Sequence, residues 1–331
     1  MDELFSYSIL FPQIPFEICE YFNKIDKTNH QFKPNNVYSF CEYYSRKYNL
    51  KVFPQPRIIA KICDILCDFQ YLSVVQKSGL ENAFSTYFCA KIPDFVSQDL
   101  KSQHLTKLDC IVYGFKHIHT LYRNQVLPIE YHNRDGDISL GSCFLYRNGI
   151  ATAKHCIEGA SKIKILGIPS DKLNTASFEI HENKAMDILF IRFMSNLTNT
   201  MHLNEEAEVL DQIIALGYPK IPGYHNFMTT DLGVVSSRFT PSIGNVASIA
   251  EDIWTKENLM LITARIRGGN SGGPIINAKG CVVGIASSRP DSEGDYDQLG
   301  YGTVIPISFL NNLIEKSDSR KLDTSEIMFL D

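Results

Sequence analysis

Ser271 lies in a glycine-rich stretch, RIRGGNSGGPII, that covers residues 265–276. The glycines Gly269, Gly272 and Gly273 let the main chain crowd around the serine, so backbone N–H groups can point into open space beside its hydroxyl. Such groups could stabilise the negative charge of an oxyanion. A glycine-rich loop can also bind phosphate, but here no Lys follows the glycines and no helix pattern comes after them, which rejects a P-loop. The stretch therefore indicates nucleophilic chemistry at Ser271.

A serine hydroxyl reacts at neutral pH only if a base takes its proton and a third group holds that base. His155 lies in GIATAKHCIEG, where a predicted strand ends in small residues and runs into a short helical turn. Asp187 lies in KAMDILFIRF, at the start of an apolar run that predicts a buried strand. Taken singly, each residue is more typical of a structural role. Together with Ser271 they form a candidate catalytic triad.

Three motifs, TAKHC, MDILFIRF and GGNSGGP, occur in the order His, Asp, Ser with intervals of 32 and 84 residues. They resemble the trypsin-like (chymotrypsin-fold) serine proteases over residues 126–312, and within that superfamily they are most similar to the HtrA (Deg) branch. GSCFLYRNGIATAKHC, TARIRGGNSGGPIIN and GYGTVIPI resemble the histidine strands, the nucleophile loop and the last inner strand of that branch. The resemblance implies two antiparallel six-stranded β-barrels with the catalytic site in the cleft between them.

The resemblance also implies roles for individual residues. Ser271 would be the nucleophile, His155 the general base and acid, and Asp187 the residue that orients the imidazole. The backbone N–H groups of Gly269 and Ser271 would form the oxyanion hole. No cofactor and no metal are expected. The primary specificity pocket would be lined by Arg265, Ile266, Gly268, Gly284, Ile285, Ala286, Ser287 and Tyr301.

The substrate preference depends on which residue forms the floor of that pocket. Arg265 matches the floor in trypsin relatives and would select acidic residues if its side chain points inward. In HtrA-like loops the neighbouring residue, here Ile266, lines the pocket and selects medium apolar residues. The acidic loop RPDSEGDYDQ, residues 289–298, could neutralise Arg265 or attract basic residues, but a solvated hairpin is the simpler interpretation. We expect an apolar or small residue on the acyl side of the cut.

Several residues depart from the family pattern. Asn270 replaces the Asp that pairs with a newly cut N-terminus in digestive proteases, so activation by that route is not expected. The pair Gly268 and Gly269 is flexible enough to flip the peptide whose N–H must face the oxyanion, and a partner that fixed this peptide would switch the enzyme on. Cys156 follows the histidine where secreted relatives form a disulfide, but we favour free thiols for it and for Cys143. The chain continues about 20 residues beyond VIPISFLNNLIE, so no C-terminal PDZ domain is expected.

The region before the protease motifs predicts a small α+β domain. Apolar residues at helical spacing predict a helix over residues 57–69, and YLSVVQKSGLENAFSTYFCA predicts a β-hairpin with Gly79 in its turn. Helical segments at 14–24 and 36–48 complete an order that resembles a winged-helix domain. Residues 1–100 carry ten Lys or Arg and eleven Asp or Glu, whereas a phosphate-binding face usually shows a basic excess. A protein contact is therefore favoured over DNA.

The chain is accordingly divided into four parts. A winged-helix-like domain covers residues 1–100, and a helical linker covers residues 101–125. From Val126 short apolar runs alternate with turn residues, which predicts a mostly β protease domain over residues 126–315. Residues 316–331 are expected to form a tail.

The composition of the chain limits the cellular compartments in which it is expected. The 331 residues carry a formal charge of -5, and the nine cysteines show no CxxC pair or zinc-finger spacing. The N-terminus lacks a basic region and is broken by two prolines, and no run approaches the roughly 20 apolar residues of a membrane span. We therefore expect a soluble cytoplasmic protein with no membrane contact and with free thiols.

The predicted function is that of an intracellular serine endopeptidase that acts on protein or peptide substrates. Its activity would be gated by the N-terminal domain or by a regulatory protein bound through residues 1–125, in a bacterial stress or phage-defence system. Two alternatives stay open. The barrels could be a catalytically silent binding or scaffold module, or the chain could be a DNA-binding regulator with a protease effector domain.

Overall fold

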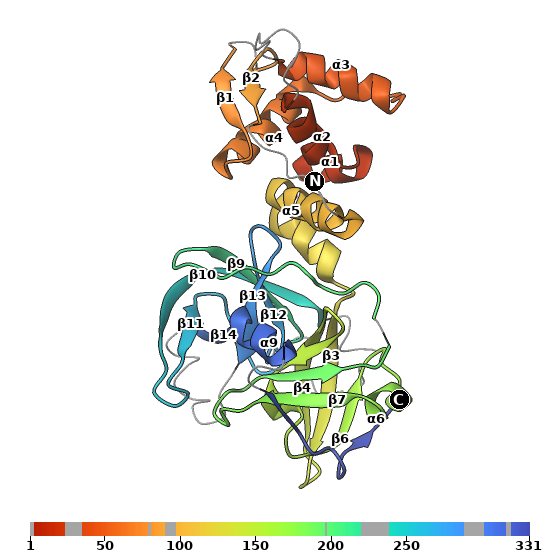
Figure 1. Ribbon diagram of the computed structural model, residues 1–331, viewed down its shortest axis with the longest axis vertical. Helices are drawn as coiled ribbons and strands as arrows, with labels where there is room; N and C mark the ends of the chain where they lie inside the picture. Colours follow the sequence, from red (N-terminus) through yellow and green to blue (C-terminus); the bar gives the residue numbers. More distant parts are fainter. Residues whose placement is uncertain are drawn as a thin grey trace. The chain divides into compact units, whose positions relative to one another are not determined.

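The computed structural model describes residues 3–23, 35–78, 81–89, 97–195, 197–219, 238–287, 301–315 and 319–331. Contacts within the chain divide it into two compact units, Met1–Ile118 and His119–Asp331 (Figure 1). In this division the first unit takes in most of the segment that the sequence assigned to a linker. Each unit has its own apolar core, and each is described by itself.

The N-terminal unit consists of helices and one antiparallel two-stranded sheet. Its elements are α1 (Glu3–Leu10), α2 (Ile14–Phe22), α3 (Val37–Lys47), α4 (Pro56–Asp68), β1 (Ser73–Gln76) and β2 (Thr86–Phe88). The apolar face predicted for α4 is confirmed, because Ile58, Ile59 and Ile62 are at most 1% exposed. The pairing of β1 with β2 confirms the predicted hairpin. The expected turn residue Gly79 lies outside the described residues.

Helix α5 (Gln98–Tyr122) follows this sheet and contains a sharp break at Gly114. Gly114 has φ 67° and ψ −163°, a conformation that is essentially restricted to glycine. Apart from its chain neighbours and the nearby backbone of its own helix, no atom lies within 4 Å of the position that a Cβ would take there. The backbone conformation, and not crowding, is therefore what requires a glycine at this break.

The C-terminal unit is mostly β, as predicted, and contains two sheets. The first is an open eight-stranded sheet in the order β15-β7-β8-β5-β4-β3-β6-β16. Its strands are β3 (Val126–Asn133), β4 (Ile138–Tyr146), β5 (Gly149–Thr152), β6 (Ala160–Ile165), β7 (Ser177–His181), β8 (Leu189–Arg192), β15 (Ser319–Lys321) and β16 (Met328–Phe329). The short helices η1 (Lys154–Cys156) and α6 (Ser170–Asn174) lie between its strands in sequence.

The second sheet is a closed six-stranded barrel in the order β10-β11-β14-β13-β12-β9. Its strands are β9 (Gln212–Gly217), β10 (Thr240–Glu251), β11 (Asn258–Ile262), β12 (Pro274–Asn277), β13 (Val282–Ser287) and β14 (Gly302–Pro306), and helix α9 (Ile307–Ile314) follows the last strand. This confirms the second of the two predicted six-stranded barrels.

The first predicted barrel differs in detail. Its six expected strands, β3 to β8, are present, but the two outer strands do not close on each other. Instead β15 pairs antiparallel with β7, and β16 pairs parallel with β6. Residues that the sequence assigned to a tail therefore supply a partner for each edge, and the sheet stays open.

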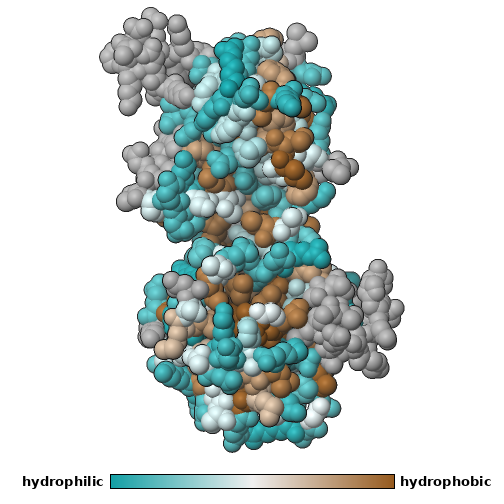
Figure 2. Space-filling model, turned by 90° about the vertical axis from the view of Figure 1, so that its right-hand side faces the viewer, coloured by the Kyte–Doolittle hydropathy of each residue, from teal (hydrophilic) through white to brown (hydrophobic). Residues whose placement is uncertain are grey.

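The surface carries scattered apolar side chains. On the face drawn in Figure 2, hydrophilic residues cover much of each unit, and smaller patches of hydrophobic residues lie among them. In the N-terminal unit, the exposed ring of Tyr38 lies with its centroid 5.9 Å from that of Phe53 and 6.0 Å from that of Phe84. Among the described residues, no helix is long and apolar enough to cross a membrane.

Candidate active site

Two neighbouring strands bring His155 and Asp187 together. Strand β5 pairs antiparallel with β8, and Thr152 at the end of β5 lies opposite Leu189 at the start of β8. His155 follows β5 on the short helix η1, and Asp187 comes shortly before β8. Both residues therefore lie at the same end of this strand pair. The imidazole Nδ1 lies 2.7 Å from Asp187 Oδ2, and the backbone N–H of His155 donates to Asp187 Oδ1 at 2.9 Å.

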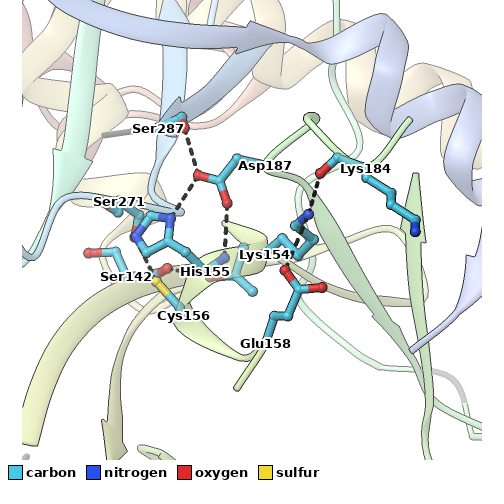
Figure 3. Close-up of polar contacts among 10 residues, drawn as sticks. Ser142, Lys154, His155, Cys156, Glu158, Lys184, Asp187, Ser271 and Ser287 are labelled. Carbon is cyan, nitrogen blue, oxygen red and sulfur yellow. Dashed lines mark hydrogen bonds and ion pairs between the residues drawn. The ribbon is translucent and has the colours of Figure 1, made fainter. Parts of the chain in front are cut away.

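The Asp187 carboxylate has a third contact. The hydroxyl of Ser287, at the end of barrel strand β13, donates to Asp187 Oδ2 at 2.7 Å (Figure 3). The side chain of Asp187 is only 15% exposed, so these bonds replace much of the water that would otherwise surround the charge. The orientation of the carboxylate is therefore fixed from both sheets.

The environment of His155 acts on its pKa in two directions. Burial disfavours the imidazolium and would lower the pKa, but the hydrogen bond and negative charge of Asp187, together with the neighbouring Cys156, outweigh burial. The net result is a pKa of His155 above its ordinary value. An imidazole held by a carboxylate in this way is a stronger base than a free one.

The loop before β12 holds Ser271. The N–H of Asn270 donates to the carbonyl of Arg267 at 2.9 Å, and Gly269 has φ 97°, which together match a type II turn with glycine at its third position. Gly272 also has a positive φ, 84°, and its N–H donates to the carbonyl of Ala286 on β13 at 2.7 Å. The loop is thereby fixed to the barrel on the side that follows the serine.

Ser271 is 3% exposed, and Figure 3 shows it with His155 and Asp187 in one cluster. Its carbonyl accepts a hydrogen bond from the N–H of Ser142 at 2.9 Å. In the part of the chain that the structure describes, no backbone hydrogen bond uses the N–H of Gly269. The structure thus brings together all four residues that the sequence assigned to the triad and the oxyanion hole.

The residues predicted for the specificity pocket fall into two groups. Arg265 is exposed, and its N–H donates to the hydroxyl of Ser242 at 2.8 Å. Ile266 is half-buried and packs against Gly302, where a Cβ would clash with it. Gly268 is exposed, and Tyr301 is 46% exposed. Three of these residues are exposed and Ile266 is half-buried, and their role in a specificity pocket stays a prediction.

The second group is the strand segment that ends in Ser287. Gly284, Ile285 and Ala286 are buried in β13, and a Cβ on Gly284 would lie 2.5 Å from Val304 Cγ1 and 2.6 Å from the carbonyl of Ile305. This leaves no open space above Gly284. The Ser287 hydroxyl contacts Asp187 instead of facing a pocket. The acidic loop at 289–298 lies outside the described residues.

The contacts of two side chains near the site were not found from the sequence. Ser142 uses its hydroxyl to donate to the carbonyl of Gly269 at 2.7 Å. Lys154 is 9% exposed, and its ammonium donates to the carbonyl of Lys184 at 2.6 Å and pairs with Glu158 at 3.3 Å (Figure 3). Lys154 therefore ties the segment before Asp187 to η1. Glu158 lies four residues after Lys154, but the carbonyls of Gly269 and Lys184 are distant in sequence from the side chains that they accept from.

All nine cysteines are free thiols. Cys156 Sγ lies 3.9 Å from the carbonyl of Ser271, directly beneath the nucleophile loop. Burial raises the pKa of Cys143 well above its ordinary value, so that thiol stays protonated. Among the described residues, no group of three or more His, Cys, Asp or Glu side chains is placed to hold a metal ion.

Comparison with known proteins is consistent with this geometry. The family model described as a trypsin-like peptidase domain matches residues 141–285. A probable periplasmic serine endoprotease described as DegP-like, from Buchnera aphidicola, is 29% identical over 171 residues, which cover 50% of this chain and 33% of the relative. The serine endoprotease DegS of Haemophilus influenzae is 25% identical over 169 residues, which cover 50% of this chain and 46% of the relative.

The chain thus spans less than half of the length of these relatives. A solved structure of the Rv3671c protease from M. tuberculosis, in its active form, aligns with a TM-score of 0.46 and 18% identity over 62% of this chain and 87% of that one. From the family match and the named relatives, the chain carries a trypsin-like peptidase domain that is similar to serine endoproteases of the HtrA branch.

Proposed function

We propose that the chain is a serine endopeptidase that hydrolyses peptide bonds of protein substrates. The observation that carries this proposal is the His155–Asp187 pair, bonded at 2.7 Å and 2.9 Å, in one cluster with Ser271. In the proposal Ser271 is the nucleophile, His155 is the base and Asp187 holds the base. A carboxylate that accepts from both the ring and the backbone of one histidine fixes the tautomer in which Nε2 can accept a proton.

The reaction begins when Ser271 Oγ attacks the carbonyl carbon of the scissile peptide and His155 Nε2 takes the hydroxyl proton. A carbon–oxygen bond forms, and the carbonyl becomes an oxyanion that faces the N–H groups of Gly269 and Ser271. The imidazolium, stabilised by Asp187, then gives its proton to the leaving nitrogen. The carbon–nitrogen bond breaks, the amine product leaves, and the acyl group stays on Ser271 as an ester.

Hydrolysis of the ester repeats these steps with water. His155 takes a proton from the water as its oxygen attacks the acyl carbon, and the oxyanion forms again at Gly269 and Ser271. When the carbon–oxygen bond to Ser271 breaks, His155 returns the proton to the serine oxygen. The carboxylic acid product leaves, and the enzyme is back in its starting protonation state.

The proposal predicts that a fluorophosphonate probe labels Ser271 and that Ser271→Ala abolishes both labelling and cleavage of casein. His155→Ala is expected to lower kcat by about 10⁴-fold or more, because the serine then lacks its base. Labelling is followed by gel fluorescence and mass spectrometry of the labelled peptide. If the folded Ser271→Ala protein cleaves casein as fast as the parent, the assignment fails. If the folded parent is never labelled, a silent binding module replaces this proposal.

The specificity part of the proposal rests on Ile266. Its half-buried side chain packs against Gly302 at the base of the nucleophile loop, whereas Arg265 is exposed to solvent. An apolar side chain at this place favours an apolar or small substrate residue on the acyl side of the cut. Mapping of cleavage sites in denatured casein by mass spectrometry tests this preference, and a majority of cuts after acidic residues would contradict it.

The setting is also part of the proposal. We place the enzyme in the cytoplasm, gated by its winged-helix-like N-terminal domain or by a protein bound through residues 1–125, in a bacterial stress or phage-defence system. The exposed aromatic side chains of Tyr38, Phe53 and Phe84 support a protein contact in this domain. A pull-down with the inactive Ser271→Ala chain would identify the partner.

A further inference from the structure

Ser142 is joined to the nucleophile loop by two hydrogen bonds of different kinds. Its hydroxyl donates to the carbonyl of Gly269 at 2.7 Å, and its backbone N–H donates to the carbonyl of Ser271 at 2.9 Å. Ser142 lies on β4 of the open sheet. One residue of the open sheet therefore holds the loop on both sides of Asn270.

The same hydroxyl reaches a third segment. It accepts a hydrogen bond from the N–H of Tyr218, directly after barrel strand β9, at 3.0 Å. The carbonyl of Ser142 in turn accepts from the hydroxyl of Thr152 at 2.8 Å. Ser142 is fully buried, so water cannot take over any of these bonds. The four bonds join the middle of β4, the ends of β5 and β9 and the nucleophile loop to one another.

These contacts bear on the oxyanion hole because they hold the peptide units that directly follow the two whose N–H groups would face the oxyanion. The Gly269 carbonyl belongs to the peptide that joins Gly269 to Asn270, directly after the glycine whose N–H would face the oxyanion. If that carbonyl is fixed, rotation in the turn is confined to the peptide between Gly268 and Gly269. Fixing the Ser271 carbonyl likewise limits the freedom of the nucleophile itself.

We infer that Ser142 is a positioning residue for the reaction, whose hydroxyl sets the orientation of the nucleophile loop and of the oxyanion-hole N–H groups. The inference rests on the proposed serine endopeptidase activity. Loss of this hydroxyl leaves the buried Gly269 carbonyl and the Tyr218 N–H without their partner. The loop then gains conformations in which the N–H groups no longer converge, and the transition state loses more than the bound substrate does.

The chain contains a matched control for the loss of a buried hydroxyl. Thr255 is 3% exposed, and its hydroxyl donates to Asp252 Oδ2 at 2.8 Å and accepts from the N–H of Glu257 at 3.3 Å. This group lies in the turn between β10 and β11. Thr255→Val removes a hydroxyl with one donated and one accepted bond, as Ser142→Ala does, but it leaves the nucleophile loop untouched.

The experiment compares the full chain with Ser142→Ala, Ser142→Cys and Thr255→Val. The rate of labelling by a fluorophosphonate and the kcat and KM for fluorescent casein are measured, with the unfolding midpoint of each protein. For Ser142→Ala we expect labelling and kcat to fall about 10²-fold, with KM within about threefold of the parent. Ser142→Cys keeps the volume and a weak donor, so its rates should lie between those of the parent and the Ala variant.

Thr255→Val should lose a similar amount of thermal stability and keep labelling within about twofold of the parent, since its bonds resemble those of Ser142. The inference is overturned if Ser142→Ala reacts at the parent rate, or if Thr255→Val loses as much activity. If Ser142→Ala does not fold, the test rests on Ser142→Cys. Labelling and cleavage by Ser142→Cys at the rates of the parent would then overturn the inference. A parent protein that cannot be labelled is a different failure, because it removes the proposed activity itself.

Discussion

His155 has a ring nitrogen and a backbone N–H that both reach one carboxylate, that of Asp187. The two bonds fix the position and rotation of the imidazole without a contribution from the substrate. The pKa of His155 is raised because Asp187, together with Cys156, favours the imidazolium more than burial disfavours it. In the proposed reaction, the proton taken from Ser271 would be held firmly by His155, and the imidazole would have to be neutral before the reaction starts.

The raised pKa predicts how activity depends on pH. Because only neutral His155 can take the proton, kcat/KM should rise with pH through an apparent pKa above the ordinary histidine value of about 6.5. Asp187→Asn should move this limb to lower pH and reduce kcat by about 10⁴-fold, because the favoured tautomer is lost. Casein cleavage and probe labelling from pH 5 to pH 10 measure both effects. A limb in the parent at or below pH 6.5 would contradict the prediction.

The His155–Asp187 pair also contributes to the stability of the folded state, and this contribution falls as the pH rises, whereas the activity increases. A histidine whose pKa is higher in the folded than in the unfolded state stabilises the fold, and it does so in full at pH values below its pKa in the unfolded state. That contribution is lost as the pH rises through the folded value. The pH range in which the enzyme gains activity is thus the range in which the pair contributes less to folding.

Gly272 shows why the nucleophile loop needs a glycine directly after the serine. Its φ is 84°, and a Cβ there would clash with the carbonyl of Ser142 and lie 2.7 Å from the N of Ala153. Gly159 has a similar φ of 80°, but no atom lies within 4 Å of its Cβ position. A comparison of the two glycines therefore separates the effect of backbone strain from the effect of crowding.

Gly159→Ala should cost about 1–2 kcal/mol of unfolding free energy, the strain of a left-handed alanine, and leave probe labelling unchanged. Gly272→Ala carries the same strain and must also push the loop away from β4 and β5, so we expect a larger loss of stability and at least a tenfold loss of labelling rate. Chemical unfolding and labelling kinetics measure the two quantities. Equal behaviour of the two variants would show that crowding at Gly272 has no role.

The sequence predicted those elements whose residues carry a clear pattern. Strand β8 is an apolar run after an aspartate, and α4 repeats its apolar residues at helical spacing, so both were found. Strand β10 was not found, because only Val246 of its residues is buried and the pattern of its side chains resembles an exposed loop. Strands β15 and β16 were missed for the same reason, since they are short and contain no buried residue.

In the candidate site, too, only residues that belong to a recognisable pattern could be predicted from the sequence. The residues of its motifs are recognisable because their chemistry requires a serine, a histidine and an aspartate in glycine-rich or strand-end contexts. Ser142 carries no such mark, because its partners Gly269 and Tyr218 lie 127 and 76 residues away in the chain. Ser287 was placed in a pocket wall because the family resemblance assigns its strand there, and its contact with Asp187 depends on how the two sheets meet.

The two units of the chain have separate apolar cores. The core of the N-terminal unit is formed by α1 to α5 and the hairpin, and it includes Phe40, Ile59 and Leu66. The open sheet and the closed barrel have cores of their own, which include Ile163 and Val283. Each unit therefore buries enough apolar surface to form a cooperative folding unit.

Separate cores predict two unfolding transitions. Ser85 in the N-terminal unit is fully buried, and its hydroxyl accepts the N–H of Ser78 at 2.9 Å. Ser85→Ala should lower the midpoint of one transition, and Gly159→Ala in the other unit should lower the midpoint of the other, each by a few degrees. Differential scanning calorimetry measures the midpoints of both transitions. A single transition that both variants shift alike would show that the units unfold as one.

Strands β15 and β16 affect how the protein is made. They come after all other strands in the sequence, yet they cover the outer edges of β7 and β6. While the ribosome is still synthesising the chain, both edges of this sheet are exposed, and an exposed edge is a template for pairing with another chain. The nascent protein is then most prone to aggregation, and a chaperone that holds it until these strands emerge would raise the yield of folded enzyme.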